Sequence, residues 1–161
     1  ILAFACPPKS RAHPESTLAV KHAELAVDLL GTVLHEVNNS AQLLSALDAL
    51  GKHVGVAVVA ERGEDLATCG ATLEAQGELL RALCGDEAAC AGSPRAVRLL
   101  WTLVKKRLAA EGRQLAYDAD ACPGQLDFAL ATRVLADARR APAGARLSLD
   151  FARGACAEVA S

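Results

Sequence analysis

A histidine with a carboxylate beside it and an amide one turn further on is the set of side chains here best suited to chemistry. The residues are His35, Glu36 and Asn39. A neutral imidazole attacks phosphorus through one ring nitrogen while the other nitrogen carries a proton. A neighbouring carboxylate takes up that proton as charge develops, and an amide one helical turn away orients the reacting group. The three residue types therefore suit the acceptance of a phosphoryl group.

A histidine that exchanges a phosphoryl group with a large protein partner must be exposed. The flanking sequence predicts that His35 lies on the polar face of a helix. No proline and one glycine, Gly31, occur between Ser16 and Leu50, so we expect one long helix there. At about 100° per residue, a set of apolar residues lies within roughly 60° of the pole opposite His35. The set is Ala26, Leu30, Val33, Val37, Leu44 and Leu47. Its spacing near four and three predicts a bundle seam.

The side of the helix that carries His35 is polar or small, and it gives the candidate partner-binding residues. These are Asp28, Gly31, Asn38 and Gln42. Gly31, one turn before His35, leaves room for a phosphoryl group or a partner loop. Other interpretations remain, because a polar helix face needs no chemistry and His-Glu pairs arise by chance. The metalloprotease pattern His-Glu-x-x-His fits poorly, since Asn39 stands where the second metal ligand belongs.

The rest of the chain predicts a second long helix and then alternating helices and strands. The expected helices span residues 63–83, 95–110 and 126–140, and the expected strands span residues 113–118 and 146–151. Ser93 and Pro94 form a helix start, as N-cap and first helical residue. Residues 54–60 suit a short strand, but we favour a helix end followed by a turn.

Composition narrows the classes of function. Lys and Arg total 17 and Asp and Glu total 19, which argues against a nucleic-acid binder held by phosphate contacts. No apolar run is long enough to span a membrane. The six cysteines form no CxxC pair, so we expect reduced, mostly buried thiols in a cytoplasmic protein, with no intrinsic metal site.

The residues around His35 resemble a known motif. The segment Leu34-His35-Glu36-Val37-Asn38-Asn39 resembles the H-box of sensor histidine kinases, His-Glu-x-x-Asn, with Ser40 in place of the usual proline. Residues 66–81 resemble the second bundle helix of that family. The resemblance implies a mainly α chain, α+β overall, in which two antiparallel helical hairpins form a four-helix bundle by dimerisation. It also implies that His35 is the phosphoacceptor at Nε2, Glu36 the acid/base partner and Asn39 the polar helper.

Later residues resemble that family's ATP-binding domain in degenerate form. Residues 130–139 are similar to its N-box helix, but Arg133 and Asp137 stand at the two asparagine positions. The family's Asp-x-Gly-x-Gly loop is missing, so we expect a truncated ATPase-like segment without ATP-dependent kinase activity. The expected organisation is a lead-in over residues 1–14, a dimerisation and phosphotransfer domain over residues 15–92, and the degenerate subdomain over residues 93–161.

The chain is also similar to histidine phosphotransferases of this build. That similarity implies two-component signalling, with transfer between His35 and the aspartate of a response-regulator receiver domain, which would supply Mg²⁺. No cofactor is expected to bind this chain itself. Two alternatives stay open: a non-catalytic dimerisation or scaffold module derived from a kinase, and a fragment of an intact sensor kinase. The Ser40 and Arg133 departures favour the scaffold alternative.

Overall fold

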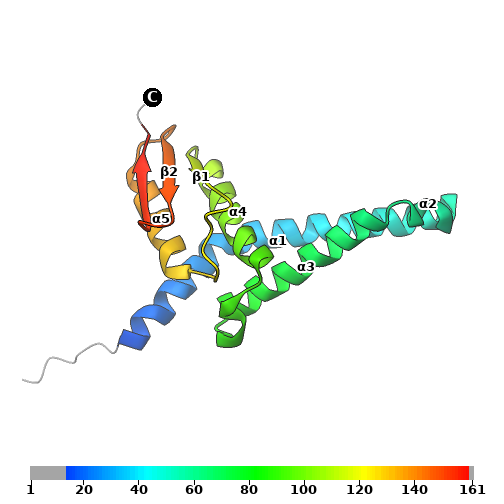
Figure 1. Ribbon diagram of the computed structural model, residues 1–161, viewed down its shortest axis with the longest axis horizontal. Helices are drawn as coiled ribbons and strands as arrows, with labels where there is room; N and C mark the ends of the chain where they lie inside the picture. The colour runs from blue at the N-terminus through cyan, green and yellow to red at the C-terminus, as the bar shows by residue number, and fades with distance from the viewer. Residues whose placement is uncertain (1–13, 160–161) are drawn as a thin grey trace, which may run out of the picture.

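The computed structural model describes residues 14–159, which are mostly helical with one small three-stranded sheet (Figure 1). The mainly helical, α+β class expected from the sequence is confirmed at this level. The expected lead-in lies outside the described residues except for Pro14, which begins the first helix.

Helix α1 (Pro14–Val54) is continuous over 41 residues and extends four residues beyond the predicted end near Leu50. Its length is about 60 Å at the rise of an α-helix. It ends at Gly55, whose φ of 101° is accessible to glycine at little cost. A short helix, α2 (Val56–Ala60), follows, so the alternative of a strand over residues 54–60 is wrong.

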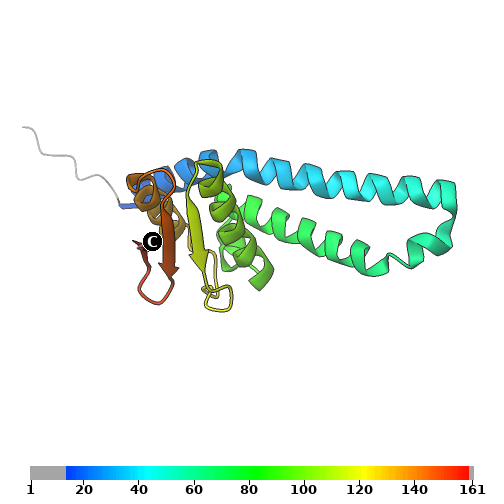
Figure 2. The same cartoon turned by 90° about the horizontal axis from the view of Figure 1, so that it is seen from above.

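Helix α3 (Gly63–Leu83) runs back alongside the later part of α1, and Figures 1 and 2 both show the two helices joined through α2. Its bounds match the predicted second helix. Cys69, Ala75, Gln76 and Leu79 are buried on it. A 3-10 helix, η1 (Glu87–Ala91), then leads to the next long helix.

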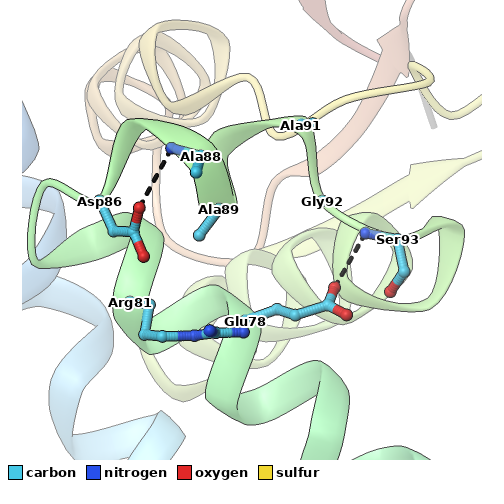
Figure 3. A pocket seen from close by; sticks show the side chains of 8 residues that line it. All are labelled: Glu78, Arg81, Asp86, Ala88, Ala89, Ala91, Gly92 and Ser93. Atoms are coloured by element: carbon cyan, nitrogen blue, oxygen red, sulfur yellow. Dashed lines mark hydrogen bonds between the residues drawn. The ribbon is translucent and has the colours of Figure 1, made fainter.

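Helix α4 (Pro94–Ala110) begins where the sequence predicts. The Ser93 hydroxyl accepts a hydrogen bond from the Ala96 amide at 3.2 Å, and Pro94 occupies the first turn, where its missing N–H costs nothing. A pocket of about 310 Å³ lies beside this start, and Figure 3 shows the residues that line it. There the Glu78 carboxylate accepts a hydrogen bond of 2.9 Å from the Ser93 backbone amide, which connects α3 to the start of α4.

The sheet contains β1 (Gln114–Tyr117), β2 (Arg146–Asp150) and β3 (Ala155–Glu158), in that order. Strands β1 and β2 are parallel, with Leu115 opposite Leu147, and α5 (Phe128–Arg140) connects them. Strand β3 pairs antiparallel with β2 and was not predicted. Helices α4 and α5 lie on one face of the sheet (Figure 2). The alternating burial of β2 shows the other face to be exposed.

The core of this helix-and-sheet unit also holds part of α1. Trp101 of α4 is fully buried and its ring meets that of Phe151 edge-on, with centroids 4.9 Å apart. Leu25, Leu29 and Val33 of α1 belong to the same buried cluster. Leu25 to Val33 of α1 are therefore packed against the C-terminal unit, and the later part of α1 is packed against α3.

The buried face of α1 differs from the predicted seam. Leu25, Leu29, Val33 and Leu47 are buried, which centres the buried face about 120° from His35 rather than opposite it. Leu30, predicted on the seam, is 47% exposed. The reason is that α4 and α5 cover α1 from the side of Leu25 and Leu29, a tertiary contact that helical periodicity does not reveal.

A second apolar face of α1 is exposed. It consists of residues spaced by four and three, the pattern of a helix-packing seam. Its members are Ala23, Val27, Leu30, Leu34 and Ala41, with half-buried Val37 between the last two. Val27 is 77% and Leu34 is 54% exposed. Helix α1 thus has one buried apolar face, one exposed apolar face and one polar face.

Candidate functional site

His35 is exposed near the middle of α1, as the sequence predicts, and lines a groove between α1 and α4 of about 420 Å³. Continuous helix on both sides of His35 sets the direction of its Cα–Cβ bond and restricts its side-chain rotamers. The residues that line the groove with it and matter for chemistry are Asp28, Gly31, Thr32 and Glu36 of α1 and Lys106 and Arg107 of α4. The structure thus brings four of the sequence-predicted residues together and adds two cations.

Glu36, the predicted acid/base partner, is engaged by a lysine. The Lys106 Nζ donates to Glu36 Oε1 at 2.6 Å, across 70 residues of sequence. The Lys106 side chain is 48% exposed and that of Glu36 is 22% exposed. An ion pair this open to water contributes at most about 1 kcal/mol to stability, so it is readily exchanged.

Asp28, a predicted partner-binding residue, is held within the chain. The Arg139 guanidinium of α5 donates to both Asp28 oxygens, each bond 2.9 Å long. It also donates to Glu111 Oε1 at 2.9 Å, so one arginine joins α1, α5 and the end of α4. These hydrogen bonds favour the charged carboxylates and hold the pKa of Asp28 and the pKa of Glu111 below their usual ranges.

Gly31 lies on the α1 side of the groove, beside the position of His35. A Cβ placed there would meet nothing within 4 Å. The space above the helix is therefore open at this residue, which leaves room for a phosphoryl group or a partner loop. A side chain here would enter the groove rather than the core.

The remaining predicted residues lie elsewhere on α1. Asn38 and Gln42 are exposed. Asn39 is also exposed and lines a separate groove of about 290 Å³ between α1 and α3, together with Ser40 and Cys69. The structure therefore places Asn39 beside α3, apart from the residues that meet at His35.

Ser40, at the position of the family's proline, keeps α1 intact. Its hydroxyl donates to the Glu36 carbonyl at 3.1 Å and accepts from Gln76 Nε2 at 3.5 Å. Gln76 is 2% exposed, and its Oε1 is buried without a hydrogen-bond partner among the described residues. Proline would remove the backbone N–H at residue 40 and bend the helix.

The two residues compared above with the asparagines of the N-box, Arg133 and Asp137, both lie on α5. Arg133 is exposed, and Asp137 is paired with Arg140 at 2.8 Å. Among the side chains that the structure describes, no group of three or more His, Cys, Asp or Glu is arranged to hold a metal ion.

The cysteines correct one expectation. The five in the described part of the chain are free thiols, but Cys69 alone of these is buried, Cys84 is exposed and the other three are half-buried. Cys6 lies outside the described residues. The expectation of mostly buried thiols is therefore wrong for this set.

Sequence reasoning missed Lys106, Arg107 and Arg139. The run Lys105-Lys106-Arg107 on a predicted helix was a visible signal of a cationic surface. What the sequence did not reveal was the packing of α4 against α1, which brings Lys106 and Arg107 to the groove that His35 also lines. Arg139 needed the same tertiary information.

Comparisons of the chain with protein-family models, with curated proteins and with solved structures gave no match. In the described part of the chain, no helix combines the length and apolar character needed to cross a membrane.

Proposed function

We propose that this protein is a histidine phosphotransfer protein in which His35 exchanges a phosphoryl group with the aspartate of a response-regulator receiver domain. The observation that carries the proposal is the exposed imidazole of His35 on a continuous helix, at a groove lined by Glu36, Lys106 and Arg107. The H-box resemblance, which covers residues 34–39, adds to it.

The chemistry is a direct phosphoryl transfer. The lone pair of His35 Nε2 forms a P–N bond while the P–O bond to the receiver aspartyl group breaks, and the aspartate leaves with that electron pair. Transfer to a receiver reverses the same step. Glu36 holds the proton of the second ring nitrogen as the imidazole becomes positive. The receiver would supply Mg²⁺ to neutralise its own phosphoryl oxygens.

The receiver is proposed to dock over the polar face of α1. Gly31, Asn38 and Gln42 present an exposed surface around His35, and Asn39 extends it toward α3. Asp28 has a different part in this account, since Arg139 holds it in place. It shapes the rim of the groove by fixing α5 against α1.

Homodimerisation into a four-helix bundle is part of the proposal. The hairpin formed by α1 and α3 leaves Val27, Leu30 and Leu34 exposed in one stripe. Contact with water costs roughly 25 cal/mol per Å² of apolar surface, so a stripe of this kind favours a helical partner. A second copy of the same hairpin presents the same spacing of four and three.

The test is transfer from a panel of phosphorylated receiver domains to the wild-type chain and to two variants. His35→Gln should abolish labelling while leaving the fold nearly unchanged, because the side chain is exposed. His53→Gln is the matched control, since His53 is also exposed on α1. Labelling that persists in His35→Gln, or a wild-type chain that no receiver labels, contradicts the proposal.

A second candidate function is a non-catalytic dimerisation module. The specific observation in its favour is that Glu36 and Asp28 are both held in ion pairs within the chain. This candidate predicts a dimer that none of the receivers in the panel labels, so the same assay separates the two functions.

A further inference from the structure

We propose that Lys106 is a positioning residue that exchanges ion-pair partners when His35 is phosphorylated. Its ammonium group moves from the Glu36 carboxylate to the phosphoryl oxygens. This inference rests on the proposed function of His35. It adds a role for a residue of α4, in the segment that resembles a degenerate ATPase domain, and it gives that segment a part in the chemistry.

Lys106 is placed so that its side chain needs only a small movement to exchange ion-pair partners. Its Nζ is bound at 2.6 Å to the side chain of Glu36, the residue directly after His35. Lys106 and His35 line the same groove. A lysine carries three donors on a flexible four-carbon stem, and this side chain is half exposed. We therefore expect rotation of the lysine side chain alone, without movement of the backbone, to bring Nζ to a group on His35.

The charges in the groove decide which cation moves. Arg107 lies next to Glu111 as an ion pair at the end of α4, with Nε 3.2 Å from Oε1 but without a hydrogen bond from that Nε among the described residues. Arg139 is hydrogen-bonded to Asp28 and Glu111. Lys106 is held by a solvent-accessible ion pair with Glu36, the residue next to His35. A phosphoryl group brings about two negative charges at neutral pH, which repel Glu36 and attract the nearest mobile cation.

The exchange has a second effect, because it frees Glu36. Without Lys106, the Glu36 carboxylate becomes available to the remaining ring N–H of phosphorylated His35, the role in which the proposed transfer needs it. The contact between α1 and α4 at Glu36 opens at the same time, whereas the Arg139–Asp28 link remains. The phosphorylation state is thereby registered at the α1–α4 contact.

The experiment uses phosphoramidate, a small phosphodonor that needs no receiver, on the full chain. Phosphorylation at His35 and its loss are followed by peptide mass spectrometry in the wild type and in Lys106→Gln, Lys106→Arg and Lys105→Gln. Lys105 is the matched control, because it is exposed and lies over the Tyr117 ring, 5.9 Å from its centroid. Thermal unfolding checks that all four proteins are folded.

A cation on the phosphoryl oxygens opposes expulsion of that group, so Lys106→Gln should shorten the lifetime of the phosphohistidine. The expected change is about two- to fivefold, the size of one half-exposed ion pair. Lys106→Arg should restore the lifetime, and Lys105→Gln should match the wild type. Equal lifetimes in Lys106→Gln and the wild type would overturn the proposal.

A purely structural lysine is excluded by a second readout, the ¹³C shift of the Glu36 carboxyl carbon. This shift should change on phosphorylation of the wild type, because the carboxylate loses its lysine, and should change much less in Lys106→Gln. The same shift change in both proteins would contradict the exchange. If the phosphohistidine lifetime depends on Lys106 but no receiver domain exchanges phosphate with His35, the exchange of ion-pair partners is supported and the proposed function is refuted. If receiver domains do exchange phosphate with His35 but the lifetime does not depend on Lys106, the proposed function is supported and the exchange of ion-pair partners is refuted.

Discussion

Arg139 and Asp28, 111 residues apart in sequence, face each other through two hydrogen bonds of 2.9 Å each. This two-point contact joins α5 to α1 two helical turns before His35. Glu111 at the end of α4 completes the cluster. The position of the C-terminal unit on the histidine-bearing helix therefore depends on charge as well as on the shared apolar core.

Removing the central guanidinium should weaken the whole fold slightly. Arg139→Gln leaves Asp28 and Glu111 without their common donor, and we expect a loss of about 1 kcal/mol of unfolding free energy. Urea denaturation measures it. Arg140→Gln is the control, since Arg140 is 80% exposed and makes an ordinary pair within one helix. Equal losses of unfolding free energy in the two variants would show that the contacts of Arg139 with Asp28 and Glu111 stabilise the fold no more than an ordinary surface ion pair does.

The same cluster predicts an acid-sensitive fold. Arg139 lowers the pKa of Asp28 and the pKa of Glu111 in the folded state, so the unfolded chain binds protons more readily. The stabilisation is therefore complete above the ordinary carboxyl range of about pH 4–5, and it disappears as the pH falls through the lowered values. Urea midpoints between pH 7 and pH 3 measure this. The decline should be shallower in Asp28→Asn, which lacks one of the two carboxyls; an equally steep decline would contradict the assignment.

Gly31→Ala should separate stability from function. The added methyl meets nothing within 4 Å, and alanine favours an exposed helix over glycine by about 0.5–1 kcal/mol, so the melting temperature should rise. The methyl also enters the groove beside His35, and we expect receiver transfer to slow at least about threefold through misplacement of the phosphoryl group. Gly70→Ala on α3, where the space is equally open, is the control. Unchanged transfer in Gly31→Ala would mean that the groove is not the site of reaction.

The exposed apolar face of α1 is the predicted interface of the proposed homodimer. Leu34→Gln should shift the proposed dimer toward monomer in sedimentation experiments, because the polar amide would be buried at the interface without a hydrogen-bond partner. Val54→Gln is the control: Val54 is also apolar and has a similar exposure, at 58% against 54% for Leu34, but it lies at the end of the helix. A monomeric wild type, or equal behaviour of both variants, would rule out this face as the interface.

Local sequence signals predicted most of the elements because their causes are local. Ser93 and Pro94 start α4 through capping and a fixed backbone angle. The end of α1 was less well predicted, since the helix was expected to end near Leu50 and continues to Val54. Strand β3 was missed because Ala155 and Ala157 give it weak strand character. The glycine at residue 154 was a sequence signal of a turn after residues 146–151, and in the structure its φ is 58°.

The candidate site was predictable where it depends on one helix. The exposure of His35 followed from the pattern of α1, as did the room at Gly31. The partners of Glu36 and Asp28 did not follow, because Lys106 and Arg139 reach α1 through the packing of distant helices. The same packing separated the apolar residues of α1 into a buried face at Leu29 and an exposed one at Leu34, which periodicity alone merges into one seam.

The central claim is that the imidazole of His35 carries a phosphoryl group received from an aspartyl phosphate. Site mapping by mass spectrometry under alkaline conditions, which preserve phosphohistidine, tests it after the wild-type chain has been mixed with phosphorylated receiver domains. The account predicts the added mass on the peptide containing His35, and its loss when unphosphorylated receiver is then supplied in excess. Phosphate found at another residue, or none on the chain with any receiver tried, would contradict it.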